Sequence, residues 1–326
     1  MTTSKSNASK SNASGAIASG SNTSGSNTSG SNTSGSNTSR SDTSRFNKVI
    51  SALGAGQHVF ATFAAADPTA AIELSDSEYD AVVFEMEHKP WDINALKDSF
   101  QYLLNRRRIF EADSLAPDVT PLVRIPANGA EKAQWHAKQA LDLGAFGIVW
   151  PHISTVEEAR NAVAACRYPR LPDAPRHEPA GLRGDGPHAA TRYWGISNTE
   201  YYARADVWPL APDGEILVGL MIEDQLGIEN LPDILDQVPG VGLILIGEGD
   251  MSQELGLPRQ YDHPRVLECK RRILDICAER GVAVAHPHVT ADNVKQVLDD
   301  GYRFLMSAPV RTYPGLRKAR ELTGRG

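Results

Sequence analysis

The sequence predicts a closed (β/α)₈ barrel, and three observations lead to that prediction. Two apolar runs rich in Val, Ile and Leu, Ile216–Ile222 and Val241–Ile246, are typical of strands buried on both faces, and six further short apolar runs accompany them. Segments with helical periodicity separate the runs, and alternating strands and helices imply a parallel sheet with right-handed crossovers. Residues 46–326 also have the length that a single barrel of this kind needs.

Strands and helices alternate along this stretch. The strands are predicted at His58–Phe63, Ala81–Glu85, Pro121–Ile125, Gly147–Trp150, Ile216–Ile222, Leu243–Ile246, Val282–Ala285 and Phe304–Met306. The helices between them are predicted at Ile93–Leu104, Ala130–Leu143, Thr155–Cys166, Leu231–Val238, Pro264–Glu279 and Ala291–Asp299. After Pro314 the chain offers only a helix of about two or three turns, which is marginal alone and needs a partner surface.

An open doubly wound sheet is the alternative architecture. No glycine-rich phosphate loop opens any of the predicted helices, which disfavours it. The G-x-G of Gly247–Gly249 lacks the third glycine of a dinucleotide motif and has no nearby P-loop lysine.

Residues 1–45 differ in composition from the rest of the chain. Ser-Asn-Thr-Ser-Gly repeats in tandem, and no acidic residue occurs before Asp42. Because such a segment has almost nothing apolar to bury, we expect a disordered tail that is dispensable for folding and activity. Each Asn-Thr-Ser is formally a glycosylation sequon, but no apolar signal segment precedes it, so we expect the sequons to be unused. Its serine content is shared with organelle transit peptides, whereas its sparse arginine argues against import.

Composition excludes several classes of function. The formal net charge of −7 argues against nucleic acid as a bulk partner, and no apolar run approaches the length of a membrane span. Three cysteines, Cys166, Cys269 and Cys277, are an odd number without CxxC spacing, so neither disulfides nor thiolate zinc is expected. We therefore expect a cytoplasmic protein.

Two irregular stretches interrupt the alternation of strands and helices, Arg106–Val119 and Arg167–Asp213. The second is long enough to cover an active-site mouth, and both are expected to line the side where a second substrate binds. Arg183, flanked by glycines, is expected to bring a positive charge over that mouth.

Carboxylates follow two neighbouring predicted strands. Glu223 comes directly after one strand, and Glu248 and Asp250 follow the next across a glycine-rich turn. The carboxyl ends of barrel strands meet on one face, where ligands bind, and converging carboxylates repel unless a cation lies between them. All-oxygen ligation suits Mg²⁺ or Mn²⁺, so the pattern indicates a metal site. Alternatively, these acids cap the helices that follow.

Other polar residues are predicted on the same face. Glu85-Met86-Glu87-His88 follows the second strand, Arg124 ends the third, and Trp150-Pro151-His152 ends the fourth. Each is weak evidence alone, because a strand-end histidine is usually only hydrogen-bonded and an arginine there can belong to a rim ion pair. Together, a base, a cation and carboxylates are the groups that metal-assisted chemistry on an anionic substrate requires.

An ordered set of short motifs resembles the HpcH/HpaI family of metal-dependent 2-oxo acid aldolases, which is itself similar to the citrate lyase β-subunit. The set spans roughly Leu53 to Pro309 and consists of x-x-E-H after strand two, V-R-I-P after strand three, K-Q-A-L-D-x-G-A at a helix end, V-x-P after strand four, Glu223 after strand five and a G-x-x-D-x-S turn. The resemblance implies a TIM barrel that binds Mg²⁺, Mn²⁺ or Co²⁺. It also implies cleavage or formation of a carbon–carbon bond next to pyruvate, with an aldehyde as the other reactant.

The resemblance assigns roles to individual residues. Glu223 and Asp250 match the metal ligands, and Arg124 matches the arginine that stabilises the enolate. His88 matches the catalytic histidine, whose partner acid falls on Asp142.

It also assigns the substrate's carboxylate to a turn. The turn Gly247–Asp250, which includes Gly249, matches the segment whose backbone N–H groups hold the pyruvate carboxylate. The family forms homo-oligomers, which implies a trimer or hexamer in which the last helix packs on a neighbouring subunit.

This chain departs from the family pattern at three places. Glu85 stands where the family often has Asp, Met221 where it has Gln, and Glu248-Gly249 where it has Pro-Ala. Losing the glutamine removes a donor to the substrate, and Glu248 adds negative charge that makes it a further or alternative metal ligand.

Three functions are therefore open. The first is a metal-dependent aldolase that releases pyruvate from a 4-hydroxy-2-oxo acid. The second reaches the same enolate by decarboxylating oxaloacetate, as macrophomate synthase does, or cleaves a CoA thioester. The third is a non-catalytic barrel that binds a metal or ligand. A Schiff-base aldolase is disfavoured, because no lysine lies inside or at the end of a predicted strand, Lys89 coming nearest.

Overall fold

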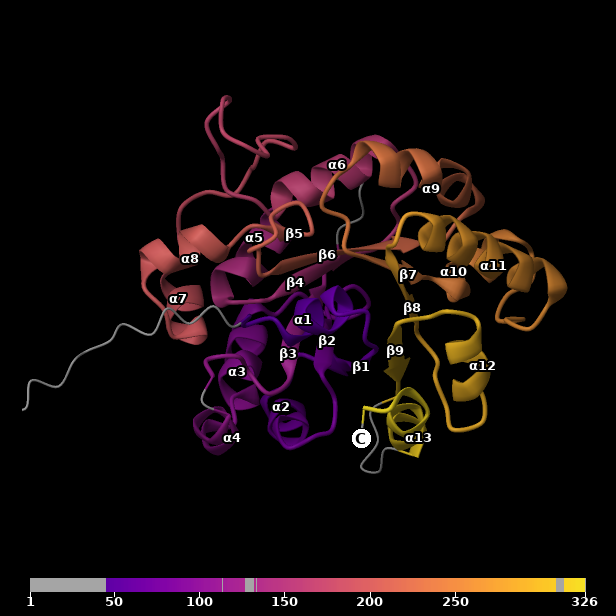
Figure 1. The fold of residues 1–326 in the computed structure, drawn as a ribbon, viewed down its shortest axis with the longest axis horizontal. Coiled ribbons are helices and arrows are strands. Elements are labelled where there is room, and N and C mark those ends of the chain that lie inside the picture. Colours follow the sequence, from indigo (N-terminus) through magenta and orange to yellow (C-terminus); the bar gives the residue numbers. More distant parts are fainter. Residues whose placement is uncertain (1–44, 113, 127–131, 133, 309–313, 326) are drawn as a thin grey trace, which may run out of the picture. The chain divides into compact units, whose positions relative to one another are not determined.

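The structure, a computed structural model, describes residues 45–112, 114–126, 132, 134–308 and 314–325. Within the unit Thr43–Gly326, eight parallel strands form a closed barrel, and helices lie outside it (Figure 1). The predicted fold class is therefore confirmed. The predicted tail lies outside the described residues except for Arg45.

The barrel strands follow the order β4-β3-β2-β1-β9-β8-β7-β6, and β4 pairs with β6 to close the ring. Their bounds are β1 Val59–Ala65, β2 Ala81–Glu85, β3 Thr120–Arg124, β4 Gly147–Trp150, β6 Ile216–Ile222, β7 Leu243–Ile246, β8 Ala283–His286 and β9 Phe304–Ser307. All eight predicted strands are present, and the β4–β6 pairing excludes the open doubly wound sheet. A short strand that the sequence does not predict, β5 (Val207–Trp208), pairs with the first residues of β6.

Side chains of the barrel strands alternate between the barrel interior and the helix layer, so both faces of each strand need apolar residues. Every residue of β4, β6 and β7 is buried, as their apolar runs predict. The first polar side chains after these strands therefore emerge together at one end of the barrel.

The helices are α1 Lys48–Gly54, α2 Pro68–Ser75, α3 Ile93–Leu103, α4 Arg106–Glu111, α5 Gln134–Leu143, α6 Val156–Ala165, α7 His188–Trp194, α8 Asn198–Arg204, α9 Gln225–Gln237, α10 Glu248–Glu254, α11 Pro264–Glu279, α12 Val294–Asp299 and α13 Pro314–Thr323. Helix α9 begins well before the predicted Leu231, because the Asp224 side chain accepts the Gly227 N–H and caps it there. Pro232 is then accommodated inside the helix. The predicted first residues of α5 fall partly outside the described residues.

Helix α1 packs at the N-terminal end of the barrel. The Asn47 side chain, which caps it, donates to the carbonyl oxygens of Phe146 at 2.9 Å and Glu215 at 3.0 Å, the residues directly before β4 and β6. Arg45 donates to the Gly214 carbonyl at 2.9 Å. Arg45, assigned to the tail in the prediction, therefore contacts the barrel.

The two inserts lie at the N-terminal end of the barrel, which corrects the prediction that they line the mouth. Each insert follows a helix and precedes a strand, and such connections in a (β/α)₈ barrel lie at the N-terminal ends of the strands. In the longer insert, Trp194 of α7 donates its indole N–H to the Gly144 carbonyl at 2.9 Å, just before β4. Its ring stacks on Phe146 with centroids 4.5 Å apart. The insert thus supports the barrel at the end away from the predicted site.

Arg183 is consequently not a cation over the mouth. Its side chain is buried, and one guanidinium nitrogen donates to Asp142, Tyr168 and Tyr201, at 3.0 Å in each case. The Tyr201 hydroxyl donates in turn to the Leu141 carbonyl at the end of α5. Arg183 therefore ties the longer insert to α5.

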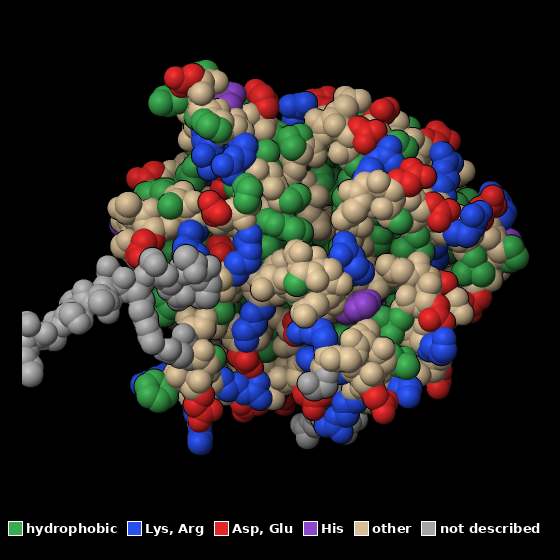
Figure 2. Space-filling view, viewed as in Figure 1, with side chains coloured by type: hydrophobic (Ala, Val, Ile, Leu, Met, Phe, Trp, Pro, Cys, Tyr) green, Lys and Arg blue, Asp and Glu red, His purple; other side chains and the backbone are tan. Residues whose placement is uncertain are grey.

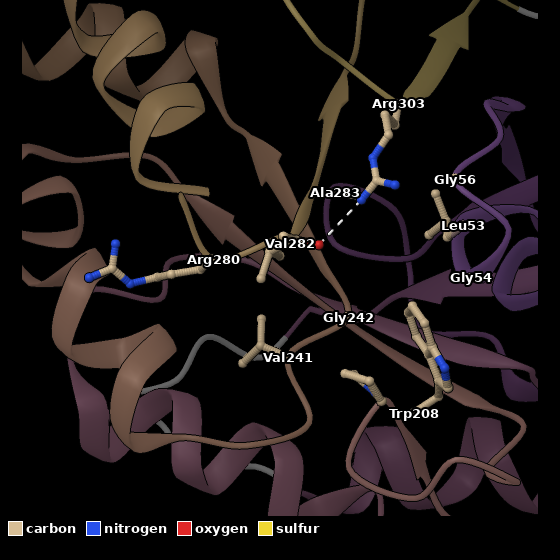
Figure 3. Close-up of a pocket in the computed structure, with 12 residues that line it drawn as sticks. Leu53, Gly54, Gly56, Trp208, Val241, Gly242, Arg280, Val282, Ala283 and Arg303 are labelled. Atoms are coloured by element: carbon tan, nitrogen blue, oxygen red, sulfur yellow. Dashed lines mark hydrogen bonds between the residues drawn. The ribbon is translucent and has the colours of Figure 1, made fainter. Parts of the chain in front are cut away.

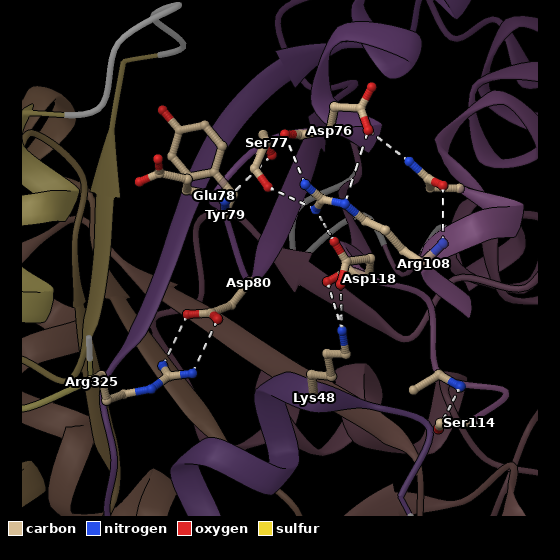
Figure 4. Close-up of polar contacts among 12 residues, drawn as sticks. Lys48, Asp76, Ser77, Glu78, Tyr79, Asp80, Arg108, Ser114, Asp118 and Arg325 are labelled. Atoms are coloured by element: carbon tan, nitrogen blue, oxygen red, sulfur yellow. Dashed lines mark hydrogen bonds and ion pairs between the residues drawn. The ribbon is translucent and has the colours of Figure 1, made fainter. Parts of the chain in front are cut away.

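Further ion pairs fasten the same end of the barrel (Figure 4). Asp118, before β3, accepts hydrogen bonds from Arg108 and, at 2.9 Å, from Lys48. Asp80, before β2, accepts hydrogen bonds from Arg325 at 3.1 and 3.2 Å. Each carboxylate thus has its own basic partner.

A cavity of ≈ 340 Å³ also opens at this end, beside Trp208 and the starts of β7 and β8 (Figure 3). Its two arginines have partners. Arg303 donates to the Gly281 carbonyl at 3.3 Å, and Arg280 pairs with Asp236 at 2.8 Å. Its charged groups are therefore already used to hold loops together.

The last helix, α13, packs on its own barrel, although the family resemblance implies packing on a neighbouring subunit. Leu316 and Ala319 are buried. Arg317 forms an ion pair with Glu78 at 3.0 Å, in the loop before β2. The short helix therefore finds the surface that it needs within the same chain.

Basic and acidic side chains are interspersed on the face shown in Figure 2, and no extended single-sign patch covers it. Among the helices of the described ranges, none has both the length and the apolar character that crossing a membrane requires.

Candidate functional site

A cavity of ≈ 560 Å³ opens at the C-terminal ends of the strands, and we call it the rim cavity. It is lined by side chains from β1, β3, β6 and β7 and by the loops that follow β2, β7 and β8. Six of the predicted site residues line it, namely His88, Arg124, Glu223, Gly247, Gly249 and Asp250. The sequence pattern after the strands therefore predicts side chains that the fold brings to one cavity.

Three potential metal ligands converge beside the rim cavity. One ligand atom each from His152, Glu223 and Asp250 lie within 4.8 Å of one another. The two carboxylates are the predicted ligands, whereas the prediction gives His152 no role. An imidazole and two carboxylates are a donor set that Mn²⁺ or Co²⁺ binds readily, and the carboxylates alone suit Mg²⁺.

Glu223 is held in a position that capping does not explain. It is buried, and its Oε2 accepts the backbone N–H of His152 at 2.7 Å. The cap of α9 is the next residue, Asp224. Burial raises the pKa of Glu223 to about 7, and the nearby carboxylates of Glu87 and Asp250 add to this shift, while His152 opposes it. A cation bound here would offset the energetic cost of burying the negative charge of Glu223, so the residues present fit a metal ion.

His152 connects this cluster to its neighbours. Its backbone has a φ of 52°, which is uncommon for a residue with a side chain, and its ring nitrogens lie 3.4 Å from Glu223 and 3.5 Å from Glu87. The hydrogen bond to Glu87 and the charges of Glu223 and Asp250 raise the pKa of His152 to about 9, against the effect of burial. A metal ion binds neutral imidazole, so an ion that coordinates His152 has to displace the proton from the ring nitrogen.

Gly247 is required where β7 ends. A Cβ atom at this position would lie 2.1 Å from Glu223 Oε1, so any other residue would displace the carboxylate. Gly249, two residues further, has open space where its Cβ would be. The turn therefore brings the backbone of the first turn of α10 close to Glu223 and leaves room for a ligand above Gly249.

Arg124 is fixed on several sides. It forms ion pairs with Glu85 and, at 3.0 Å, with Glu87, and one guanidinium nitrogen lies 3.7 Å from the Met221 sulfur. The guanidinium carbon lies 4.7 Å from the centre of the Phe63 ring. Its Nε is buried with no hydrogen-bond partner among the described residues. Arg124 thus presents a rigid positive charge with one unused donor.

His88 lies in a loop that Glu85 orders. One Glu85 oxygen accepts the backbone N–H groups of Glu87 at 2.8 Å and His88 at 3.1 Å. The imidazole itself is 65% exposed and lies 3.5 Å from Glu87. The ring therefore has freedom to move in the cavity.

The expected pairing of His88 with Asp142 does not form within the chain. Asp142 lies at the end of α5 and pairs with Arg183 at 3.0 Å. Helix α5 leads into β4, so its last residues lie at the N-terminal end of the barrel, opposite the rim cavity. The acid that lies beside the His88 ring is Glu87, at 3.5 Å, and sequence reasoning did not assign it.

Glu248 is tied away from the metal cluster. It is buried, Lys270 donates to its Oε2 at 2.8 Å, and the His288 ring bonds its other oxygen. Burial alone would raise the pKa of Glu248, but these partners outweigh it and lower the pKa to about 2. Glu248 is therefore an ionised, fully paired carboxylate, and the expectation that it is a metal ligand finds no support in its contacts.

Comparison with known proteins agrees with this geometry. The sequence profile of the HpcH/HpaI aldolase/citrate lyase family matches residues 60–308. A hydroxypyruvate/pyruvate aldolase of Roseobacter denitrificans is 30% identical over 80% of this chain and 90% of its own length. A 2-keto-3-deoxy-L-rhamnonate aldolase of Salmonella schwarzengrund is also 30% identical, over 63% of each chain.

Solved structures extend the comparison. The crystal structure of an HpcH/HpaI aldolase/citrate lyase family protein from Burkholderia cenocepacia J2315 is similar, with a TM-score of 0.67 and 25% identity over 86% of this chain and 98% of that chain. The profile match covers most of the chain, so this protein belongs to the HpcH/HpaI aldolase/citrate lyase family. Because its family and relatives are aldolases, it is a carbon–carbon lyase of the aldolase type.

Proposed function

We propose that this member of the HpcH/HpaI family is a divalent-metal-dependent, class II aldolase that cleaves a 4-hydroxy-2-oxo acid to pyruvate and an aldehyde, or joins them. The observation that carries the proposal is the convergence of His152, Glu223 and Asp250, because both carboxylates of this cluster line the same cavity as Arg124. A structural cluster would place one basic partner on each acid, whereas here the buried carboxylate of Glu223 and the exposed carboxylate of Asp250 converge.

The residues that would hold the metal ion are Glu223 and Asp250, with His152 as a third ligand. When bound, a divalent ion supplies a Lewis acid that stabilises negative charge on the keto oxygen of a 2-oxo acid. A ring nitrogen among the ligands favours Mn²⁺ or Co²⁺ over Mg²⁺.

The start of α10 is suited to the carboxylate of the 2-oxo acid. The turn Gly247–Asp250 presents backbone N–H groups of the first helical turn, where intrahelical acceptors are missing. Gly249 leaves space above them. Glu248 would repel an anion, but its charge is compensated by Lys270 and His288.

Arg124 and His88 would complete the reaction. As the enolate forms, negative charge grows on the keto oxygen, and the fixed guanidinium of Arg124 stabilises it without reorganising. His88 would carry the proton of the aldehyde-derived hydroxyl, with Glu87 rather than Asp142 as its acidic neighbour. The exposed ring can reach a hydroxyl on a substrate that fills the cavity.

Proton exchange at the methyl group of pyruvate tests the proposal, because it reports enolate formation without requiring the aldehyde. We expect deuterium from heavy water to enter the methyl group, exchange to stop in EDTA, and Mn²⁺, Co²⁺ or Mg²⁺ to restore it. Heat-denatured protein with the same metal is the control. Exchange that persists after complete removal of metal would rule out the metal-dependent mechanism.

We also propose that the chain is a homo-oligomer, trimeric or hexameric. Two large aromatic side chains, Phe110 and Trp135, are 85% and 51% exposed, and exposed apolar surface favours association. Sedimentation velocity at micromolar concentration should show an assembly larger than one chain. A single species at the mass of the monomer would contradict this.

A further inference from the structure

A turn of unusual composition forms part of the rim cavity wall. The Gln260 N–H donates to the Leu257 carbonyl at 3.0 Å, which closes a four-residue turn with Pro258 in its second position. Arg259, in the third position, has a φ of 60°. This is the pattern of a type II turn, in which the third residue is normally glycine because it needs a positive φ. An arginine is therefore kept where the backbone favours a residue without a side chain.

The turn is fixed to the helix that carries Asp250. The Ser252 hydroxyl accepts the Arg259 N–H at 3.0 Å and donates to the Gly249 carbonyl at 2.7 Å. The Leu257 N–H donates to the Ser252 carbonyl at 2.8 Å. Because Ser252 is completely buried, the position of Arg259 is coupled to the first turn of α10.

The Arg259 side chain lines the rim cavity and is exposed. Among the residues that the structure describes, no acceptor, carboxylate or ring contacts its guanidinium, whereas Arg124 in the same cavity has two carboxylate partners. Tyr261 lies beside it in the cavity wall and stacks on His288, with ring centroids 5.7 Å apart and planes at 17°. The wall thus offers a free positive charge next to a flat aromatic surface.

The proposed function leaves this part of the cavity without a ligand. The three-carbon acid is assigned to Arg124, Glu223 and the start of α10. At ≈ 560 Å³ the rim cavity lies within the size range of pockets for larger ligands, about 300–1,000 Å³. The second reactant, the aldehyde, has to approach the carbon next to the keto group from the remaining space.

We propose that Arg259, with the Tyr261–His288 stack, forms the acceptor subsite and selects aldehydes that end in an anionic group, a carboxylate or a phosphate. This inference rests on the proposed aldolase function and names the substrate class of the same site. The guanidinium binds either anion through paired N–H donors, while the stacked rings cover the carbon chain between the anion and the reacting carbonyl. Arg259 determines specificity and takes no part in forming the enolate.

The test compares matched aldehydes with pyruvate as the donor. One pair is succinic semialdehyde and butanal, and the other is glyceraldehyde 3-phosphate and glyceraldehyde. We expect the protein to prefer the anionic member of at least one pair by tenfold or more in kcat/KM, and the pair that shows the preference identifies the anion. In Arg259→Gln, kcat/KM for the anionic aldehyde should fall by about ten- to a hundredfold, whereas kcat/KM for the neutral aldehyde should change little.

Two further variants separate charge from backbone effects. Arg259→Gly suits the positive φ, so it should fold at least as well as the parent protein and still lose the preference. Arg259→Lys keeps the positive charge but lacks the planar guanidinium, so it should retain part of the preference for the anionic aldehyde. Pyruvate proton exchange should be unchanged in all three variants.

Exchange also distinguishes the two ways of failing. If the unaltered protein exchanges pyruvate protons but shows no preference in either pair, or if Arg259→Gln keeps the preference, the acceptor subsite is overturned and the aldolase proposal stands. If the unaltered protein shows no metal-dependent exchange, the aldolase proposal itself fails, and the subsite fails with it.

Discussion

The two ends of the barrel both bury charged side chains but arrange them in opposite ways. At the N-terminal end each carboxylate has its own basic partner, as in Asp206 with Arg167 at 2.6 Å and Asp142 with Arg183 at 3.0 Å. At the C-terminal end one oxygen each of the buried Glu223 and the exposed Asp250 lies within 4.8 Å of the other and of a His152 ring nitrogen. A buried charge is therefore not by itself a sign of function. The informative feature is a buried carboxylate, Glu223, that lies beside a second acid rather than beside an arginine or lysine of its own.

The pKa values of two of these acids, Asp206 and Glu223, differ in the same sense. Burial alone would raise the pKa of Asp206, but Arg167 and Arg170 outweigh it and hold the pKa below its usual value. Burial raises the pKa of Glu223 to about 7, and neighbouring acids reinforce the shift. Arg167 and Arg170 thus stabilise the negative charge of Asp206, whereas burial disfavours the negative charge of Glu223.

Removing the charge of Glu223 or Asp250, at the C-terminal end of the barrel, should have the largest effect on activity. In Glu223→Gln and Asp250→Asn the size of each side chain is kept, but a negative metal ligand is lost. We expect metal affinity and the pyruvate exchange rate to fall by at least about a hundredfold. Calorimetric metal titration and the exchange assay measure the two effects.

The stability of these variants is the control. Relief of carboxylate repulsion offsets the weaker hydrogen bond that an amide accepts, so the free energy of unfolding should change by no more than about 1 kcal/mol. If both variants keep metal binding and activity within a few-fold, the two acids have only a structural role. The contrast between the ends of the barrel would then lose its functional meaning.

Breaking an ion pair at the N-terminal end of the barrel should lower stability and leave activity unchanged. Asp206→Asn removes the partner of Arg167, which is completely buried and would keep an uncompensated charge. The loss of a partner in a buried pair costs about 3–5 kcal/mol of unfolding free energy. Denaturant melts should show that loss, while exchange per folded molecule should stay unchanged. A large loss of exchange at full folding would contradict the division of roles.

The smallest effect is expected for the same variant, in how its free energy of unfolding depends on pH under acidic conditions. Because the folded-state pKa of Asp206 is lower than its usual 3.8, the ionised carboxylate stabilises the fold above about pH 4. That contribution is lost as the pH falls through the folded pKa. The parent protein should therefore lose stability on acidification below pH 4 more steeply than Asp206→Asn, as melts at several pH values can show.

Sequence reasoning recovered the barrel because its signal is local. The apolar runs of β2, β4, β6 and β7 have the predicted bounds, since strands buried on both faces need uninterrupted apolar residues. Glu223, Asp250 and Arg124 were predicted at the rim for the same reason, because polar residues at or shortly after the end of such a run emerge there. Helix starts were less accurate where a single cap, such as Asp224, decides them.

The remaining errors concern three-dimensional neighbours. Asp142 matches a motif, yet its side chain lies at the opposite end and pairs with Arg183. Glu87 and His152 follow strands closely in the sequence, and the prediction noted both. Only the fold shows that Glu87 lies between Arg124 and His152. The inserts were placed at the wrong end, although their position between a helix and a strand already indicates the N-terminal end. That signal lies in the order of the elements rather than in any residue.

The closure of the ring between β4 and β6 has a consequence for how the chain folds. Gly147 pairs with Leu217, and the whole longer insert lies between them. Bringing two such edges together costs loop-closure entropy, which slows the search for the final contact. The Trp194–Phe146 stack draws the insert back to the edge of β4 and shortens that search. We therefore expect Trp194→Ala to refold more slowly, in stopped-flow fluorescence or circular dichroism, while each refolded molecule keeps its full rate of pyruvate exchange.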